Sequence, residues 1–272
     1  MLDIETWPKL REPVLVLTLT GWVDAGEAGA LASATLAAQL EGARQFGTYA
    51  LDDIVDLQQT RPTVELVEGT TRRITWPKVT LIAGRAGRDV VVASGPEPSL
   101  RWPSFARDLV DLASRLGVVQ AFTLGGMPAA VSHRYPVNVL ATATAHSLAQ
   151  EVGAMRADYE GPTGVQTVVQ HELGRAGIPT VGLWAQVPHY VSGNPSPPAV
   201  RALLARLREL AGLHIDLRDL DEQVERYREK VDEGVAERPD VAELVRAIEA
   251  QTVEEVSGDA IAAEIERFLR DQ

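Results

Sequence analysis

Four clusters of glycine, acidic and aromatic residues follow predicted strands, and these clusters carry the residue types most suited to chemistry. Asp24, Glu160 and His189 are their titratable side chains. In an open α/β sheet, loops beyond the carboxyl ends of parallel strands meet at one edge and form a cleft. We therefore expect a shared cleft, lined by Gly21, Trp22, Asp24, Gly26, Gly125, Gly126, Met127, Tyr159, Glu160, Gly161, His189 and Tyr190. The alternative is that the glycines and prolines of these loops only make tight turns.

The stretch 14–42 has the clearest strand–turn–helix pattern. Its first part, VLVLTLT, is apolar on both faces, which is typical of a strand buried on both sides in a parallel sheet. Gly21 allows a sharp turn, and Asp24 is suited to cap the alanine-rich helix that follows. Glu27 stands three residues after Asp24, so we expect the two to form a capping box.

The turn in this stretch, GWVDAGEAG, resembles a phosphate-binding loop but has the wrong spacing. Its glycines stand at 21, 26 and 29, and no Gly-Lys-Ser/Thr follows. Asp24 and Glu27 also place carboxylates where a phosphate would need the positive end of the helix. We therefore expect a structural turn or a polar pocket wall rather than a phosphate site.

Other familiar catalytic patterns are incomplete. The sequence has no G-x-S-x-G nucleophile motif and no cysteine. HELGR at 171–175 lacks the second histidine of a zinc helix. Ser132 and His133 are adjacent, so they do not face each other as a nucleophile and its base without unusual geometry. We assign no catalytic residue, no metal ligand and no cofactor.

Length and charge bound the remaining functions. The chain has 272 residues, enough for one large α/β domain with an appendage. Its net charge is −12, and residues 215–272 account for −10 of it, with 18 acidic and 8 basic residues. The basic surface that nucleic acids require is missing. No apolar run approaches the roughly 20 residues of a membrane span, and the N-terminus is unlike a signal peptide. We expect a soluble cytoplasmic protein with no nucleic-acid or membrane partner.

The coarse element pattern alternates strands and helices. This succession predicts an α/β fold with a mixed, largely parallel sheet flanked by helices. We predict that 57–69 is turn-rich and that a Gly-rich turn at 84–87 joins two strands. The expected strands are 14–20, 43–52, 72–83, 89–94, 118–126, 137–144 and 178–191, and the expected helices after the first are 104–116, 145–153, 165–177 and 198–212.

A different pattern begins at Leu217. Apolar residues recur every three or four positions as far as Val235, which predicts an amphipathic helix. A second helix is expected from Pro239 to about residue 250, and a third from Ser257 or Asp259 to about Leu269. We therefore divide the chain into a core domain, 1–214, and an acidic helical subdomain, 215–272. Its acidic surface is either solvated or a docking element for a basic partner.

Four motifs in order carry a family resemblance. They are TGWVDAGEAG (20–29), LGGMPA (124–129), YEGPTGV (159–165) and VPHYV (187–191). Together they resemble the proteasome assembly chaperone 2 family, in its bacterial, actinobacterial-type branch. The resemblance covers roughly 10–270. It implies a phosphorylase/hydrolase-like α/β fold, a C-terminal helical region and a homo-oligomer, which we expect to be a trimer or tetramer.

The resemblance also implies a function. Archaeal and eukaryotic relatives are chaperones that bind proteasome α-type subunits during assembly, and those that dock often end in a hydrophobic residue, Tyr and any residue. This chain ends Arg270-Asp271-Gln272, with Asp in place of Tyr. We therefore expect any contact with proteasome-type subunits to use another surface.

The sequence leaves three functions open. The first is a non-enzymatic, homo-oligomeric protein with a chaperone-like or protein-interaction role. The alternative is an enzyme or a nucleotide- or nucleoside-binding protein that uses the cleft around Asp24, Glu160 and His189. A third possibility is an assembly in which the acidic helices mediate only self-association.

Overall fold

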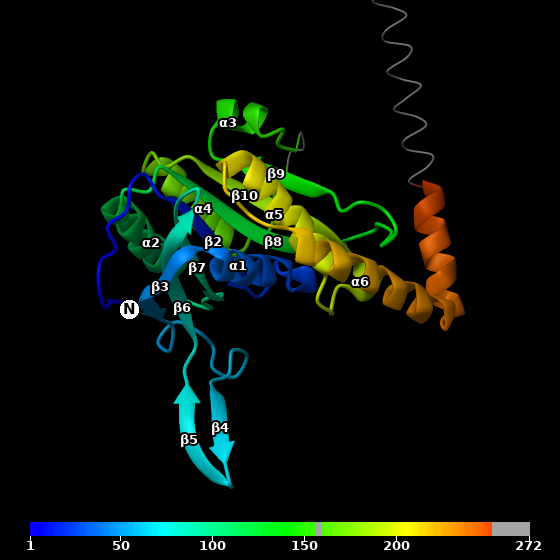
Figure 1. The fold of residues 1–272 in the computed structure, drawn as a ribbon, viewed down its shortest axis with the longest axis horizontal. Helices are drawn as coiled ribbons and strands as arrows, with labels where there is room; N and C mark the ends of the chain where they lie inside the picture. The colour runs from blue at the N-terminus through cyan, green and yellow to red at the C-terminus, as the bar shows by residue number, and fades with distance from the viewer. Residues whose placement is uncertain (156–158, 252–272) are drawn as a thin grey trace, which may run out of the picture.

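A computed structural model describes residues 1–155 and 159–251. It shows an eight-stranded mixed sheet covered by helices on both faces (Figure 1). The strand order across the sheet is β1-β3-β6-β7-β2-β8-β10-β9. The strands are β1 (Leu2–Ile4), β2 (Val14–Thr20), β3 (Glu41–Ala50), β6 (Lys78–Ala86), β7 (Arg88–Pro96), β8 (Gln120–Ala129), β9 (Val139–Ala143) and β10 (Thr180–Pro188).

The centre of the sheet is parallel. Strands β7, β2, β8 and β10 run in one direction, while both flanks pair antiparallel. Strand β2 lies in the middle, and its first six residues are buried. A central strand covered on both faces needs apolar residues at consecutive positions. The predicted fold class, a mixed α/β sheet flanked by helices, is thus confirmed.

Two helical layers form two cores. Helices α1 (Ala28–Gln39) and α5 (Pro197–Ala211) cover the face to which Val14 and Val16 point. Helices α2 (Trp102–Leu116) and α4 (Val165–Arg175) cover the face of Leu15 and Leu17. The alternation of β2 side chains therefore assigns neighbouring residues to different cores. A short helix, α3 (His146–Glu151), follows the edge strand β9.

Helix α6 (Arg218–Ala236) begins in the main core and ends outside it. Leu217 and Leu220 pack with α1 and α5, whereas Val231 and Val235 pack against Val245 in a separate small cluster. Residues 239–251 are helical, as predicted. The predicted third helix and the terminus 270–272 lie outside the described residues.

The segment 57–75 differs from the prediction. Instead of a turn-rich stretch leading into one long strand, it forms a separate two-stranded sheet of β4 (Thr63–Val67) and β5 (Thr70–Thr75). The hairpin projects from the body (Figure 1). Its strands are short and exposed throughout, so they lack the buried apolar run on which strand prediction relies.

No helix in the described part of the chain is long and apolar enough to cross a membrane.

Gly29 and Gly234 make a matched pair for testing the packing of α1. Both lie in helices, but a Cβ on Gly29 would lie 2.6 Å from the backbone oxygen of Leu124, whereas nothing lies within 4 Å of a Cβ on Gly234. We expect Gly29→Ala to lower the free energy of unfolding by about 1–3 kcal/mol through overpacking. Gly234→Ala should raise it by about 0.5–1 kcal/mol, because alanine favours a helix. Urea unfolding of both variants checks this, and equal effects would contradict the close packing.

Candidate functional site

The carboxylate of Asp24 closes the N-terminus of α1. Its Oδ1 accepts a hydrogen bond from the backbone N–H of Gly29 at 2.7 Å, and its Oδ2 accepts one from Ala30 at 3.4 Å. A 3₁₀ turn, Ala25–Glu27, separates Asp24 from the helix, so the cap reaches five and six residues along the chain. Glu27 has a left-handed backbone with φ 49°. The capping function predicted for Asp24 is present in this shifted form, but within the described residues no side-chain hydrogen bond of Glu27 completes the predicted capping box.

Burial changes the acidity of Asp24. Desolvation raises its pKa from 3.8 to about 6, although the hydrogen bonds from Gly29 and Ala30 act in the opposite direction. Nearby Glu27 adds a smaller increase through charge repulsion. The carboxyl group therefore titrates in a mildly acidic range, because burial disfavours its charged form.

A second carboxylate, Glu97, closes the N-terminus of α4. Glu97 follows β7, and its Oε1 accepts a hydrogen bond from the backbone N–H of Val165 at 2.8 Å. Its Oε2 accepts one from Trp22 at 3.3 Å. A Cβ on Gly21 would lie 2.8 Å from this Oε2, so the glycine leaves room for the carboxylate. Two helix ends that could attract an anion are therefore occupied by acidic groups of the chain itself.

The remaining glycines of this edge allow backbone segments to pack closely. Gly125, Gly126 and Met127 lie within β8 rather than beyond it, and Asp24 forms a parallel β-bridge with Gly126. A Cβ on Gly126 would lie 2.1 Å from the carbonyl oxygen of Ala25. One on Gly26 would lie 2.7 Å from the Cβ of Ser196. Such contacts are possible only for glycine.

The other candidates lie in separate, exposed surroundings. Tyr159 is exposed and donates a hydrogen bond to the carbonyl oxygen of Pro162, while Glu160 and Gly161 are exposed beside it. His189 is exposed and its Nδ1 lies 3.1 Å from the carbonyl oxygen of Ala129. Within the described residues, no hydrogen bond or ion pair joins Asp24, Glu160 and His189. The shared cleft that we predicted around these three groups stays a prediction.

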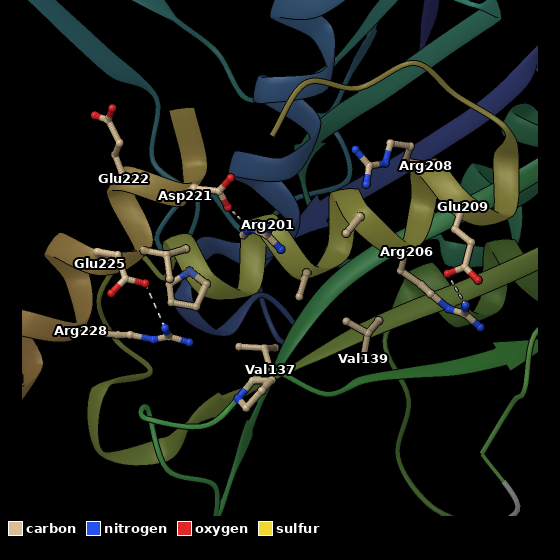
Figure 2. Close-up of a pocket in the computed structure, with 15 residues that line it drawn as sticks. Val137, Val139, Arg201, Arg206, Arg208, Glu209, Asp221, Glu222, Glu225 and Arg228 are labelled. Atoms are coloured by element: carbon tan, nitrogen blue, oxygen red, sulfur yellow. Dashed lines mark hydrogen bonds and ion pairs between the residues drawn. The ribbon is translucent and has the colours of Figure 1, made fainter. Parts of the chain in front are cut away.

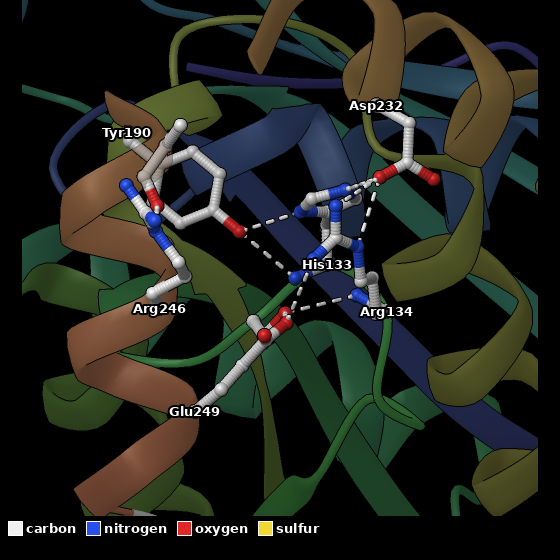
Figure 3. Close-up of polar contacts among 8 residues, drawn as sticks. His133, Arg134, Tyr190, Asp232, Arg246 and Glu249 are labelled. Atoms are coloured by element: carbon white, nitrogen blue, oxygen red, sulfur yellow. Dashed lines mark hydrogen bonds and ion pairs between the residues drawn. The ribbon is translucent and has the colours of Figure 1, made fainter. Parts of the chain in front are cut away.

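A polar network instead forms around the buried side chain of His133, in the loop after β8 (Figure 3). The imidazole is fully buried, with its Nδ1 2.7 Å from the hydroxyl of Tyr190 and its Nε2 3.1 Å from Oδ1 of Asp232. The backbone N–H of His133 also donates to the Tyr190 hydroxyl. Three segments distant in sequence thus meet at one histidine: the β8–β9 loop, the turn after β10, and α6.

The neighbours of His133 extend this network to the last described helix. Arg134 donates two hydrogen bonds to Oδ1 of Asp232, at 2.7 and 2.9 Å, and contacts Glu249 at 3.4 Å. Ser132 donates its hydroxyl to Glu249 at 2.7 Å. Burial of Asp232 would raise its pKa, but the hydrogen bonds from Arg134 and His133 lower it below its usual value. We call these residues the polar latch: Ser132, His133, Arg134, Tyr190, Asp232 and Glu249.

The polar latch has the parts of a proton relay but not of an activated nucleophile. Burial raises the pKa of Tyr190, so its hydroxyl stays protonated at neutral pH. Ser132 is hydrogen-bonded to Glu249, while His133 contacts Tyr190 and Asp232. The sequence prediction that Ser132 and His133 do not act as a pair agrees with this geometry. The network therefore fixes the helical region against the strand ends.

Sequence reasoning missed Glu97 and the polar latch for different reasons. Glu97 stands three positions after the predicted strand 89–94, in GPEPS, and that position was the available signal. His133 and Asp232 are 99 positions apart, and neither belongs to a recognised motif. No cluster of potential metal ligands occurs within 1–155 and 159–251.

Two grooves flank α6. One, of about 1030 Å³, runs between α5, α6 and the start of β9 (Figure 2). Its charged side chains largely pair with one another, as Arg201 does with Asp221 and Arg206 with Glu209. The other, of about 780 Å³, lies between α6, Val241 and the turn that begins at Tyr190. We call the second one the α6 groove.

Fold and site together define a class of protein. It is an α/β sheet protein with an appended helical region, and its own carboxylates occupy two helix N-termini at the strand ends. The PAC2 family model matches residues 18–235, and the chain belongs to this family. Among curated proteins, none matches the chain.

Solved structures of actinobacterial proteins are similar to this chain. A proteasome-assembly chaperone homologue from Mycobacterium tuberculosis is 37% identical, covers 85% of this chain and 99% of its own, and has a TM-score of 0.79. A PAC2 family protein from Streptomyces avermitilis is 39% identical, with 86% and 99% covered and a TM-score of 0.78. The archaeal proteasome activator PbaB from Pyrococcus furiosus shares the fold at 18% identity, with 86% and 97% covered and a TM-score of 0.69.

Asp24 should give the protein a distinct pH dependence. Because its pKa is higher in the folded state, it favours folding at low pH, and this contribution is lost as pH rises from about 4 to about 6. The change amounts to about 3 kcal/mol at most. Asp24→Asn removes the titration and keeps an oxygen acceptor. The free energy of unfolding of Asp24→Asn minus that of the unsubstituted chain should therefore increase as pH rises from about 4 to about 6. Exposed Asp52→Asn is the control, and parallel pH profiles for all three proteins would contradict the assignment.

Asp232 should be needed to hold α6 in place. Asp232→Ala leaves His133 Nε2 buried without its acceptor, at a cost of about 1–3 kcal/mol. We expect faster amide hydrogen exchange in α6 and 239–251, with the β2 and β8 amides unchanged. Glu233→Ala, at the exposed neighbouring position, is the control. Unchanged exchange in the Asp232 variant would show that the polar latch does not hold the helices.

Proposed function

We propose that this chain is a non-enzymatic, self-associating protein with a chaperone-like role, and that its partners are proteasome-type subunits in the cytoplasm. The observation that carries the proposal is the closure of the strand ends. Asp24 and Glu97 occupy the N-termini of α1 and α4, and the polar latch ties the loops after β8 and β10 to the C-terminal helices. An α/β enzyme would instead leave this edge open for a ligand.

Family membership supports the same proposal. The Mycobacterium tuberculosis relative is a proteasome-assembly chaperone homologue, and the more distant Pyrococcus furiosus protein is a proteasome activator. Both descriptions concern protein partners rather than small substrates. We infer that the present chain also acts by binding protein, as three or four associated copies.

The α6 groove is the surface that best suits such a partner. Its lining is largely apolar and includes Val191, Pro195, Val231 and Val235. Cations also line it: Arg226, Lys230 and Arg238. An apolar segment with acidic flanks would fit, because apolar contact supplies the affinity and the cations select the charge.

Gly234 offers a clean test of this groove. It lines the groove, and the space in front of a Cβ is open. We expect Gly234→Trp to fill the groove and abolish recovery of the partner from an extract of the source cells, while Gly234→Ala binds as the unsubstituted chain does. Cross-linking followed by mass spectrometry identifies the partner, and proteasome-type subunits are the expected result.

The same proteins should be heated with nucleotides, nucleosides and phosphate. We expect no change in melting temperature with any of them. A ligand that binds only the native state stabilises it by about 2.7 kcal/mol at a hundredfold excess over its Kd, so a true ligand would be obvious. Such a shift, together with no protein partner for any variant, would overturn the proposal in favour of a small-molecule function.

A further inference from the structure

The hairpin of β4 and β5, with Trp76 directly after it, is an arm that the rest of the described residues, 1–155 and 159–251, leaves uncovered. Its two strands pair only with each other within the described residues, and every residue of both is exposed. Large apolar side chains are exposed along it: Val64 by 57%, Leu66 by 61%, Ile74 by 52% and Trp76 by 51%. An exposed apolar surface of this kind marks an interaction site.

The arm has one apolar face and one face that is polar apart from Val67, which is 40% exposed at the end of β4. Val64 pairs directly with Ile74, and Leu66 lies on the same face because side chains alternate along a strand. The opposite face carries Thr63 across from Thr75, and Glu65 across from Arg73 with an ion pair at 3.2 Å. This pattern suits a two-stranded sheet that packs against another protein surface with one face and leaves the other face in solvent.

A free hairpin of this length would not hold its shape. An isolated two-stranded hairpin is at best marginally stable in water, and it needs further strands or a packing surface. A surface that must be covered whenever the protein is folded requires a partner that is always present. A second copy of the chain meets this condition.

Charge also points to a second copy. Residues 57–78 contain four basic side chains and two acidic ones, whereas the whole chain has a net charge of −12. The described C-terminal residues 215–251 contain twelve acidic and six basic side chains. The arm and α6 leave the body in different directions (Figure 1). A second copy therefore offers an acidic surface to a basic arm, and opposite charges favour that encounter.

We propose that the apolar face formed by Val64, Leu66 and Ile74 packs against a second copy of this chain and holds the oligomer together. This proposal rests on the self-association in the proposed function and names the surface through which the copies associate. Contact between different patches on the two copies would close into a ring when the rotation permits.

Two double variants test the arm on the full-length chain. Val64→Lys with Ile74→Lys places charge on the apolar face, and Thr63→Lys with Thr75→Lys places the same charge on the opposite face at the neighbouring cross-strand pair. All four positions are exposed, so the body should fold in both variants. By sedimentation, we expect the first to fall to the mass of one chain and the second to keep the oligomer mass.

A second measurement does not depend on dissociation. The chain has no cysteine, so Val64→Cys and Thr63→Cys each introduce a single thiol. In the oligomer, alkylation at position 64 should be severalfold slower than at 63, and dilution should remove the difference. This decides the matter should the lysine variants misfold.

The outcomes distinguish a failure of self-association from a failure of the arm contact alone. An unsubstituted chain that is monomeric would overturn the self-association in the proposed function, and the arm contact with it. An oligomer that survives the apolar-face substitutions, with equal alkylation at 63 and 64, would overturn only the arm contact. Retained mass of the polar-face variant together with loss in the apolar-face variant supports it.

Discussion

The structure depends on how the chain satisfies the N-termini of helices α1 and α4 with its own carboxylates. Each such helix presents unpaired N–H groups and a partial positive charge at the edge where α/β proteins bind ligands. Here Asp24 supplies the acceptor for α1 and Glu97 for α4. These two helix N-termini are therefore occupied within the fold, and Gly21 and Gly126 allow the close approach that this requires.

The C-terminal helices complete the closure. His133 and Arg134 leave the end of β8 and bind Asp232 of α6, while Ser132 binds Glu249. The His133 imidazole at the centre of the polar latch is fully buried, so a ring nitrogen without a partner there would carry a desolvation cost. The helical region is thus positioned by polar contacts at one point and by Leu217 and Leu220 in the main core at another.

Asp24 and Glu97 occupy helix N-termini at the strand ends, whereas two apolar surfaces lie exposed elsewhere on the molecule. The α6 groove has an apolar lining, and the arm of β4 and β5 has an apolar face. These two surfaces have distinct characters: one is a groove between helices, the other a projecting sheet. In our proposals the groove binds a partner protein and the arm binds a second copy.

The sequence by itself determined the elements with strong periodicity. The apolar run of β2, the stripe from Leu217 to Val235 and the fold class all follow from local patterns, because burial of a whole face repeats along the chain. The family followed from four ordered motifs. Only the tertiary structure decided the partners of Asp232 and Glu97, which lie 99 and 75 positions from the residues they bind, His133 and Trp22. It also decided that residues 63–75 form an arm, since exposed strands carry no burial pattern for a sequence to display.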